Sequence, residues 1–346
     1  MLANAASLLN LGLEPGAGKA PRILVCGDAN FAYSSALASE LCKNGQDARL
    51  WTSCYEHEDG LFERYPDARP VVASLRHNSR VQELRHGVDC RAIRDYFSSC
   101  SFDRIVFNLP QAPVVPGARN KIQRHRALLR DFCASAEEAL APNGQLWISL
   151  LAGQGGTCLD PLQRQHGDTW QLQHAGASAN LLVREALHVE TSAIGYTPTG
   201  RRANQRITPA RLSPGLVVHV LSREGEPDQP AACGPLEWHF HNTFRSDAAI
   251  AEEEEYDGEQ LLGWARAALD ASTSHALTGP PVLLRSQPLR QNGCAVTFRF
   301  VYSSSRIALS RERVQQANAA ACAAIAHATG LQWSLGYPVR PQPVAS

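Results

Sequence analysis

The fold is decided by residues 22–34, Arg22-Ile-Leu-Val-Cys-Gly27-Asp-Ala-Asn-Phe-Ala-Tyr-Ser34. Ile23, Leu24 and Val25 form a continuous apolar run that is typical of a parallel strand covered on both faces, and the run is too short for a buried helix. The glycine after it permits a tight turn before the next helix. Doubly wound sheets bind ligands at such turns, but the GxGxxG pattern of dinucleotide sites is incomplete here. The stretch indicates either a nucleotide-like ligand site or a plain structural turn.

The composition predicts a soluble globular protein. With 346 residues the chain is long enough for two domains with separate cores, and 44% of its residues are hydrophobic while 19% are charged. Its 33 basic and 33 acidic residues give a formal net charge of zero, so a contact with RNA requires a local basic patch. No apolar stretch reaches the length of a membrane helix, so we expect no membrane partner.

The cysteines and the first residues bear on the compartment. Ten cysteines lie between Cys26 and Cys322 without a CxxC pair, so zinc ribbons and thioredoxin-type sites are not expected, and we predict no metal. A reduced intracellular compartment follows. For the location we expect the cytoplasm or the nucleolus. Residues 1–20 are rich in Ala, Leu and Gly and contain no basic residue before Lys19, which we interpret as a mobile tail, with an organelle signal as the alternative.

Apolar patterning predicts alternating strands and helices up to about residue 222. This order favours a mostly parallel sheet with a terminal antiparallel pair. The expected elements are a strand at Ile23–Val25, a helix at Phe31–Lys43, a strand at Ala48–Ser53, a strand ending at His86–Asp89, a helix at Arg91–Phe97, a strand at Phe102–Asn108, a helix from about Asn120 to Leu140, a strand at Gln145–Leu151, a helix at Trp170–Glu185, and strands at Ala186–Ala193 and Gly215–Leu221.

Polar residues follow several of these strands. Glu56, with Glu58 and Asp59 as near rivals, lies where a dinucleotide or adenosyl site places an acid for the ribose hydroxyls; a solvated acidic loop is the alternative. Asp89 is a candidate to accept from an adenine amino group, or else to cap the next helix. Asn108 ends the clearest strand, and Pro110 fixes the turn after it, which puts a rigid amide over the ligand crevice or forms a structural turn.

A basic cluster lies in the loop after Gly195-Tyr196. Arg201, Arg202, Arg206 and Arg211 form the concentrated basic patch of this otherwise neutral chain. Arginines bind backbone phosphates through charge and bidentate hydrogen bonds, so the cluster predicts an RNA contact, with a solvated loop as the alternative.

The residues now show a family resemblance. The segments Ile23–Ser34, His86-Gly-Val-Asp-Cys90, Phe102–Gln111, the Trp170 helix and Gly195-Tyr196 to Arg202 together resemble the 25S ribosomal RNA uridine-N(3) methyltransferase-like domain, over roughly residues 21–222. The resemblance implies the Rossmann-like fold of class I methyltransferases, S-adenosylmethionine (SAM) as cofactor, and methylation of N3 of a uridine in large-subunit ribosomal RNA, with transfer RNA as the alternative substrate.

The resemblance also implies residue roles. It assigns SAM contacts to Gly27, Asp28, Ala29, Asn30, Phe31, Glu56, Asp89 and Asn108, a catalytic set to Asp28, Asn108 and Pro110, and the RNA contact to Arg201, Arg202 and Arg206. N3 of uracil must lose a proton, and His125 is a further candidate to assist. The chain departs from the family pattern at Ala29, where the family has glycine, and at Leu109 and Gln111, where it has Phe and His.

The end of the chain predicts a second domain. Residues 224–235 are a Pro/Gly-rich linker. Strands at Leu236–Phe244, Val282–Leu289, Ala295–Tyr302 and Leu331–Leu335, with helices at Gln260–Ala271 and from Ser310 to about Thr329, give the β-α-β-β-α-β order of an α+β ferredoxin-like domain. Thr297-Phe-Arg-Phe, Ile307-Ala-Leu-Ser310 and Val314 resemble the ferredoxin-fold anticodon-binding domain, which implies binding of an RNA stem or loop; dimerisation is the alternative.

These observations predict a tail at 1–20, a methyltransferase domain at 21–223, a linker at 224–235 and a ferredoxin-like domain at 236–346. Two functions remain open. One is a SAM-dependent RNA methyltransferase. The other, suggested by Ala29, Leu109 and Gln111, is a catalytically inactive RNA-binding or ribosome-associated protein.

Overall fold

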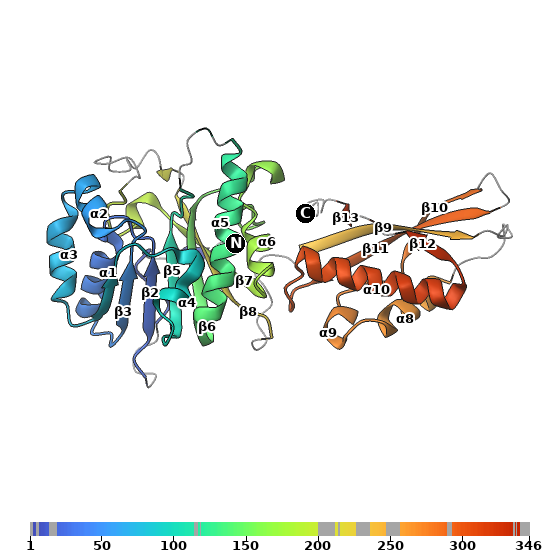
Figure 1. Cartoon of the computed structure of the whole chain (residues 1–346), viewed down its shortest axis with the longest axis horizontal. Coiled ribbons are helices and arrows are strands. Elements are labelled where there is room, and N and C mark those ends of the chain that lie inside the picture. The colour runs from blue at the N-terminus through green and yellow to red at the C-terminus, as the bar shows by residue number, and fades with distance from the viewer. Residues whose placement is uncertain are drawn as a thin grey trace. The chain divides into compact units, whose positions relative to one another are not determined.

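The computed structural model describes residues 3–4, 7–13, 19–113, 117, 119–199, 212–213, 215–225, 236–246, 257–288, 293–334, 336 and 338–339. The chain divides into two compact units, Met1–Cys233 and Gly234–Ser346, coloured blue to yellow and yellow to red in Figure 1. The division falls within residues 224–235. In the described ranges, no helix is long and apolar enough to span a bilayer.

The first unit is built on an eight-stranded sheet. Its strand order is β1-β7-β8-β6-β5-β2-β3-β4. In chain order the elements are β1 (Ala3–Asn4), β2 (Arg22–Cys26), α1 (Ala32–Lys43), β3 (Arg49–Ser53), α2 (Glu58–Arg64), α3 (Ala68–Arg76), β4 (Val81–Arg85), α4 (Ile93–Tyr96), β5 (Phe102–Asn108), α5 (Lys121–Ala139), β6 (Leu140–Leu151), α6 (Leu172–Ala177), β7 (Leu181–Val189) and β8 (Leu216–Arg223).

The sheet is mostly parallel. Strands β2 to β6 pair in parallel with their neighbours, whereas β8 runs antiparallel to both β6 and β7. The predicted α/β class and the antiparallel pair near one end of the sheet are therefore confirmed. Because the carboxyl ends of β2, β3, β5 and β6 meet at one edge, the turns after these strands are brought together.

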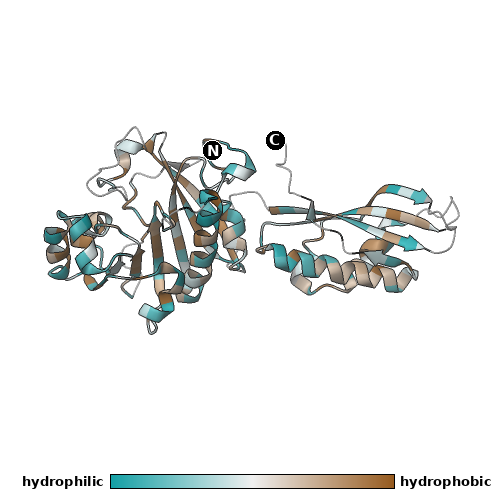
Figure 2. Ribbon diagram, turned by 45° about the horizontal axis from the view of Figure 1, so that its top comes forward, coloured by the Kyte–Doolittle hydropathy of each residue, from teal (hydrophilic) through white to brown (hydrophobic). Residues whose placement is uncertain are grey.

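Alternate residues of the strands face two separate cores. Leu24 and Cys26 of β2 belong to a core shared with α4, α5 and α6, while Ile23 and Val25 belong to a core shared with α1 and α3. Helices thus cover both faces, and Figure 2 shows apolar residues following the central strands. Burial on both faces explains the continuous apolar run of residues 23–25.

The amino-terminal segment differs from the mobile tail that composition predicts. Residues Ala3–Asn4 pair in parallel with β7, and Leu8 and Leu11 are each 3% exposed within the core that contains α1. The Leu8 carbonyl also accepts a hydrogen bond from the Tyr33 hydroxyl at 3.2 Å. Apolar burial, which the Ala/Leu-rich composition permits equally well, fixes the described part of this segment on the sheet.

One strand prediction and one helix prediction were wrong in position. The strand expected to end at His86–Asp89 is β4, Val81–Arg85, and residues 86–89 form the loop after it. The helix expected at Trp170–Glu185 ends at Ala177, and β7 starts at Leu181. Pairing of β7 with β8 along residues 181–189 overrides the helical spacing of its leucines.

The second unit is an antiparallel sheet with helices packed on one face (Figure 1). Its elements are β9 (Leu236–Ser246), α8 (Gly258–Ala267), α9 (Ala271–Ser274), β10 (Val282–Pro288), β11 (Cys294–Ser304), α10 (Arg311–Thr329), β12 (Gln332–Ser334) and β13 (Pro338–Val339). The strand order is β10-β11-β9-β12, with β13 also paired to β9. The β-α-β-β-α-β order of a ferredoxin-like domain is present.

Local sequence explains the long helix of this unit. Ser310 is its N-cap, and its hydroxyl accepts from the Arg313 N–H at 3.1 Å. Gly330 ends the helix in the left-handed conformation with φ of 70°. Between these caps, Val314, Ala321 and Ile325 face the core that holds the aromatic side chains of β9 and β11.

Candidate functional site

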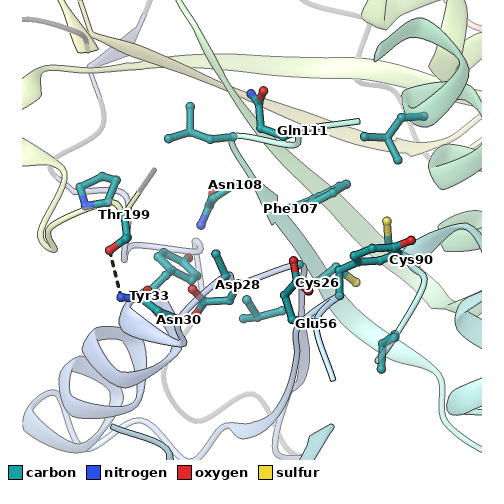
Figure 3. A pocket seen from close by; sticks show the side chains of 18 of the residues that line it. Cys26, Asp28, Asn30, Tyr33, Glu56, Cys90, Phe107, Asn108, Gln111 and Thr199 are labelled. Carbon is teal, nitrogen blue, oxygen red and sulfur yellow. Dashed lines mark hydrogen bonds between the residues drawn. The ribbon is translucent and has the colours of Figure 1, made fainter. Parts of the chain in front are cut away.

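A cavity of about 560 Å³ lies at the carboxyl edge of the first unit's sheet. This volume is within the range of about 300–1,000 Å³ that is usual for small-molecule sites. Figure 3 shows side chains from the ends of β2, β3 and β5 around it. Among the residues that line it are Gly27, Asp28, Ala29, Asn30, Tyr33, Glu56, Asp89, Asn108, Leu109, Gln111, Gln154, Tyr196 and Thr199.

The turn after β2 requires glycine at its first position. Gly27 has φ of 63°, and a Cβ built there would lie 2.6 Å from Cε2 of Phe107. Both the positive φ and the lack of room for a Cβ therefore require glycine here, and the backbone of Gly27 lines the cavity without a side chain. Ala29 is not among the residues with positive φ, so its methyl group introduces no backbone strain where the family has glycine.

Asp28 is held by neutral donors. Its Oδ2 accepts from the Ser34 N–H and from the Ser34 hydroxyl, both at 2.7 Å, and the Ser34 hydroxyl also contacts that of Thr52. Burial raises the pKa of Asp28 above its usual value, against the lowering effect of the Ser34 hydrogen bonds. A carboxyl in this state exchanges a proton more readily near neutral pH than an exposed aspartate does.

The residues after Asp28 divide between the cavity and the core. The Asn30 Nδ2 donates to Thr199 Oγ1 at 2.9 Å, which joins the turn to the segment that contains Tyr196 (Figure 3). Phe31, a predicted cofactor contact, does not line the cavity. It is fully buried, with φ of 61°, and packs edge-on against His86 at 5.3 Å between ring centroids. Phe31 supports the turn from beneath.

The two further acids at the wall are each paired with an arginine. Glu56 forms an ion pair with Arg64, and both line the cavity. Asp89 accepts from the Arg91 N–H at 3.0 Å and from the Arg91 guanidinium, and these hydrogen bonds lower the pKa of Asp89. Asp89 caps the following turn, as one of the two alternatives predicts, and it also lines the cavity, while its contact with an adenine amino group stays a prediction.

Asn108 ends β5 with one half of its amide engaged. Its Oδ1 accepts from the Ser149 hydroxyl at 2.6 Å. Its Nδ2 is buried and points toward Tyr33 in Figure 3, yet it has no partner at hydrogen-bond distance among the described residues. Its proximity lowers the pKa of Tyr33, although the larger effect of burial raises that pKa. A free, buried donor at a cavity wall is a place for a ligand's acceptor.

The turn after Asn108 is strained. Leu109 has φ of 48°, which is unusual for a bulky side chain, and its N–H donates to the Ser149 carbonyl at 2.9 Å. Pro110 is buried and is not among the cavity-lining residues. Gln111 lines the cavity, and its Oε1 lies 3.4 Å from Nε2 of His125. His125 is buried against Trp170 behind Gln111 rather than at the wall.

Two tyrosines were not predicted at the site. Tyr33 and Tyr196 both line the cavity, and their rings pack edge-to-face at 5.3 Å between centroids. Burial raises the pKa of both hydroxyls, so they stay neutral at the wall. Tyr33 lies in the segment Ile23–Ser34, and Tyr196 directly follows Gly195 in a second segment of the family resemblance. Their positions in these two segments could have indicated that they line the site. Gln154, from the loop after β6, was also missed.

Two further predictions concern the surroundings of the site. Arg201, Arg202 and Arg206 lie outside the described residues. Within the part of the chain that the structure describes, no group of three or more His, Cys, Asp or Glu side chains is arranged to hold a metal ion.

Comparisons with known proteins place this site in context. Residues 24–198 match the family model BMT5-like, described as rRNA (uridine-N3-)-methyltransferase BTM5-like. The human Ferredoxin-fold anticodon-binding domain-containing protein 1 is 31% identical over 205 residues, which cover 58% of this chain and 31% of that protein. The mouse homolog is 30% identical over 188 residues, 54% of this chain and 29% of its own length. The chain thus spans about a third of each relative.

Solved structures with resemblance to the chain include two methyltransferase-related proteins. TrmN from Thermus thermophilus is 17% identical, with 60% of this chain and 44% of that chain covered and a TM-score of 0.34. A methyltransferase homolog protein from Pyrococcus horikoshii is 14% identical, with 61% and 64% covered and a TM-score of 0.37.

Proposed function

This chain belongs to the BMT5-like family, and we propose that it transfers a methyl group from SAM to N3 of a uridine in large-subunit ribosomal RNA. The observation that carries the proposal is the cavity in which Asp28, held by neutral donors, faces the same space as the free amide of Asn108. Such a pair suits a substrate that must both lose a proton and be oriented.

The cavity fits SAM by its own features. The backbone at Gly27 is open where a Cβ would meet Phe107, and Glu56 and Asp89 supply acceptors for ribose hydroxyls and an adenine amino group. Their arginine partners leave lone pairs for such contacts, because each carboxylate accepts more than one hydrogen bond. SAM, when bound, supplies an electrophilic methyl group.

Asp28 is the preferred proton acceptor among the cavity's carboxyls. Glu56 and Asp89 are neutralised by Arg64 and Arg91, whereas Asp28 has hydroxyl and amide donors only. The Ser34 hydroxyl, in contact with Thr52, holds Oδ2 in one orientation. Asp28 therefore accepts the N3 proton, and its raised pKa matches that task better than an ordinary aspartate would.

Asn108 orients the base. Its Ser149 hydrogen bond fixes the amide so that Nδ2 is the donor left without a partner among the described residues. Uracil has carbonyl oxygens on both sides of N3, and a donor to one of them stabilises the negative charge that develops as the proton leaves. The fully buried Tyr33 and the partly buried Tyr196 limit the access of water to these groups.

The RNA strand must be brought to this cavity with its target base unstacked. Arg201, Arg202 and Arg206 are proposed to contact its phosphates. The second unit, through its ferredoxin-like topology and its resemblance to anticodon-binding domains, is proposed to bind RNA as well.

The experiment is methyl transfer with a nucleoside readout. Purified chain is incubated with SAM and large-subunit ribosomal RNA, and the digested RNA is analysed by mass spectrometry for 3-methyluridine. We expect that product from the wild-type chain and its loss in Asp28→Asn, while binding of S-adenosylhomocysteine persists in both. SAM binding without any methylated nucleoside, or RNA binding indifferent to SAM, would favour the catalytically inactive RNA-binding protein instead.

A further inference from the structure

A second basic region lies beside the cavity, in and before α5, whose Leu128 lines it. From Arg104 to Arg130 the chain has six Lys and Arg residues and no Asp or Glu, although acids and bases are equal in number over the whole sequence. Three of these cations, Arg119, Lys121 and Arg124, lie at the start of α5, and the first two are exposed. None of the three forms an ion pair with a described carboxylate.

The position of these cations is unfavourable for the isolated helix. The first turn of α5 contains no acidic residue, and its positive side chains lie at the positive end of the helix dipole. No described acid offsets this repulsion. Cations that destabilise the start of a helix, without an acid in its first turn, indicate that a bound anion neutralises them when the protein functions.

The start of α5 is next to the cavity. Lys121, Arg124 and Leu128 are spaced three and four residues apart and so share one helix face, and Leu128 lines the cavity. On the same helix, Nε2 of His125 lies 3.4 Å from the cavity-lining Gln111. Cations on this face therefore border the place where the target base would enter.

A fourth cation reaches this rim from a different loop. A Cβ on Gly153 would lie 2.9 Å from Nε of Arg164, and Gly153 lies between Leu151 and Gln154, which both line the cavity. Arg164 is exposed and forms no ion pair with a described residue.

That loop is fixed to α5 by Arg126. The Arg126 guanidinium donates to the carbonyl oxygens of His166, Gly167 and Thr169 at 2.8–3.0 Å. Two separate segments, α5 and the loop that contains Arg164, thus present cations next to cavity-lining residues.

We infer that Arg119, Lys121, Arg124 and Arg164, here called the basic rim, bind the phosphates of the RNA strand that flanks the target uridine. This inference rests on the proposed function and names the surface that holds its substrate. A row of cations that form no ion pair with a described carboxylate is complementary to a polyanionic backbone, and its place beside the cavity sets the register of the strand. Contacts of this kind position the strand and do not read its sequence.

The test compares charge removal at the rim with the same removal elsewhere. The rim variant is Arg119→Gln/Lys121→Gln/Arg124→Gln, in which glutamine keeps helix propensity. The matched control is Lys19→Gln/Lys43→Gln/Arg49→Gln, which removes three exposed cations. Lys19 precedes β2, Lys43 ends α1 and Arg49 starts β3, so all three lie toward the amino ends of the strands and not at the carboxyl edge. A third variant adds Arg164→Gln to the rim set.

Binding is measured in the full-length chain by fluorescence anisotropy with a labelled oligouridine of about 16 nucleotides, across a salt series. Because each lost phosphate contact on a single strand lowers the slope of log K against log salt by about 0.7, we expect the rim variant to lose about 2 from that slope and to bind at least about tenfold more weakly. The control keeps the wild-type slope. In methyl transfer, the rim variant raises KM for RNA more than it lowers kcat.

Two outcomes would overturn the inference: a rim variant with the same affinity and salt slope as the control, or no RNA binding by the wild-type chain. Calorimetry with S-adenosylhomocysteine shows whether the rim variant keeps its cofactor cavity. Wild-type RNA binding that depends on the rim but yields no methylated nucleoside supports the rim and overturns the proposed activity instead.

Discussion

The Asp28 carboxylate accepts two hydrogen bonds from Ser34, one from the backbone N–H and one from the hydroxyl, each at 2.7 Å. Because both donors are neutral, burial dominates and the pKa of Asp28 is raised. The folded chain therefore binds this proton more tightly than the unfolded chain does. Its contribution to stability is favourable at low pH and is lost as pH rises from the ordinary aspartate pKa through the raised value.

Asp28→Asn should remove that dependence. Because asparagine carries no charge, we expect the variant to melt at a higher temperature than the wild type near neutral pH. We also expect it to lose methyl transfer by about 10²-fold or more. Melting curves of both chains from about pH 4 to pH 8 give the comparison. A wild-type melting temperature that falls on acidification while that of Asp28→Asn stays flat would show that the charged form is stabilised, against this prediction.

Asn108→Ala should separate orientation from cofactor binding. It removes the free Nδ2 donor and the acceptor of the Ser149 hydroxyl. We expect kcat to fall by about 10²-fold, as for other donors that stabilise developing negative charge, with a much smaller change in affinity for S-adenosylhomocysteine. Ser149→Ala, which frees the amide to rotate, should have a weaker effect of the same kind. Equal losses of affinity and turnover would make Asn108 a cofactor contact only.

Gly27→Ala should close the cradle after β2. The new Cβ meets the Phe107 ring at 2.6 Å and is held at a φ of 63°. We expect a loss of stability of about 1–3 kcal/mol and at least about tenfold weaker binding of S-adenosylhomocysteine. Gly45→Ala is the matched control, because Gly45 has φ of 62° with no atom within 4 Å of a Cβ. If Gly45→Ala weakened the binding of S-adenosylhomocysteine as much as Gly27→Ala does, the loss of affinity would come from lower stability and not from the clash with Phe107.

A reciprocal amide pair should stabilise the second unit. Asn242 and Asn318 are fully buried, and each donates its Nδ2 to the Oδ1 of the other, at 2.8 and 3.0 Å. Asn318→Ala leaves the partner amide unsatisfied, which should cost about 1–3 kcal/mol in urea unfolding. In a double-mutant cycle, Asn242→Ala/Asn318→Ala should cost less than the sum of the single changes. If the losses of stability in the two single variants were fully additive in the double variant, Asn242 and Asn318 would not be energetically coupled.

The sequence was informative where one physical signal acted alone. The apolar run of β5 and the helical spacing of α5 predict both elements to within about one residue, since each is buried in the centre of the unit. Strand β4 was placed wrongly because it is the edge strand, half-exposed, and its residues Val-Gln-Glu-Leu-Arg lack a continuous apolar run. Pairing partners, which the linear pattern does not contain, decided its position.

The site was predictable at strand ends and not elsewhere. Gly27, Asp28 and Asn108 follow directly from strands whose carboxyl ends share an edge, so topology alone brings them to the cavity. Tyr196 reaches the same wall from a loop beyond β7, and Phe31 turns away into the core because of its left-handed backbone. Neither long-range packing nor a positive φ at Phe is encoded in local spacing.

The first residues of the chain bear on how its ligand affinity should be studied. Ser7 and Leu9 lie against Gly195, so that a Cβ there would approach each at 3.0 Å, and the Leu8 carbonyl accepts from Tyr33. Shortening the protein to begin at residue 20 would remove the residues that pack behind Tyr33 and next to Gly195, which precedes Tyr196. Dissociation constants measured on such a truncated protein would describe a less well supported cavity than that of the chain with these residues.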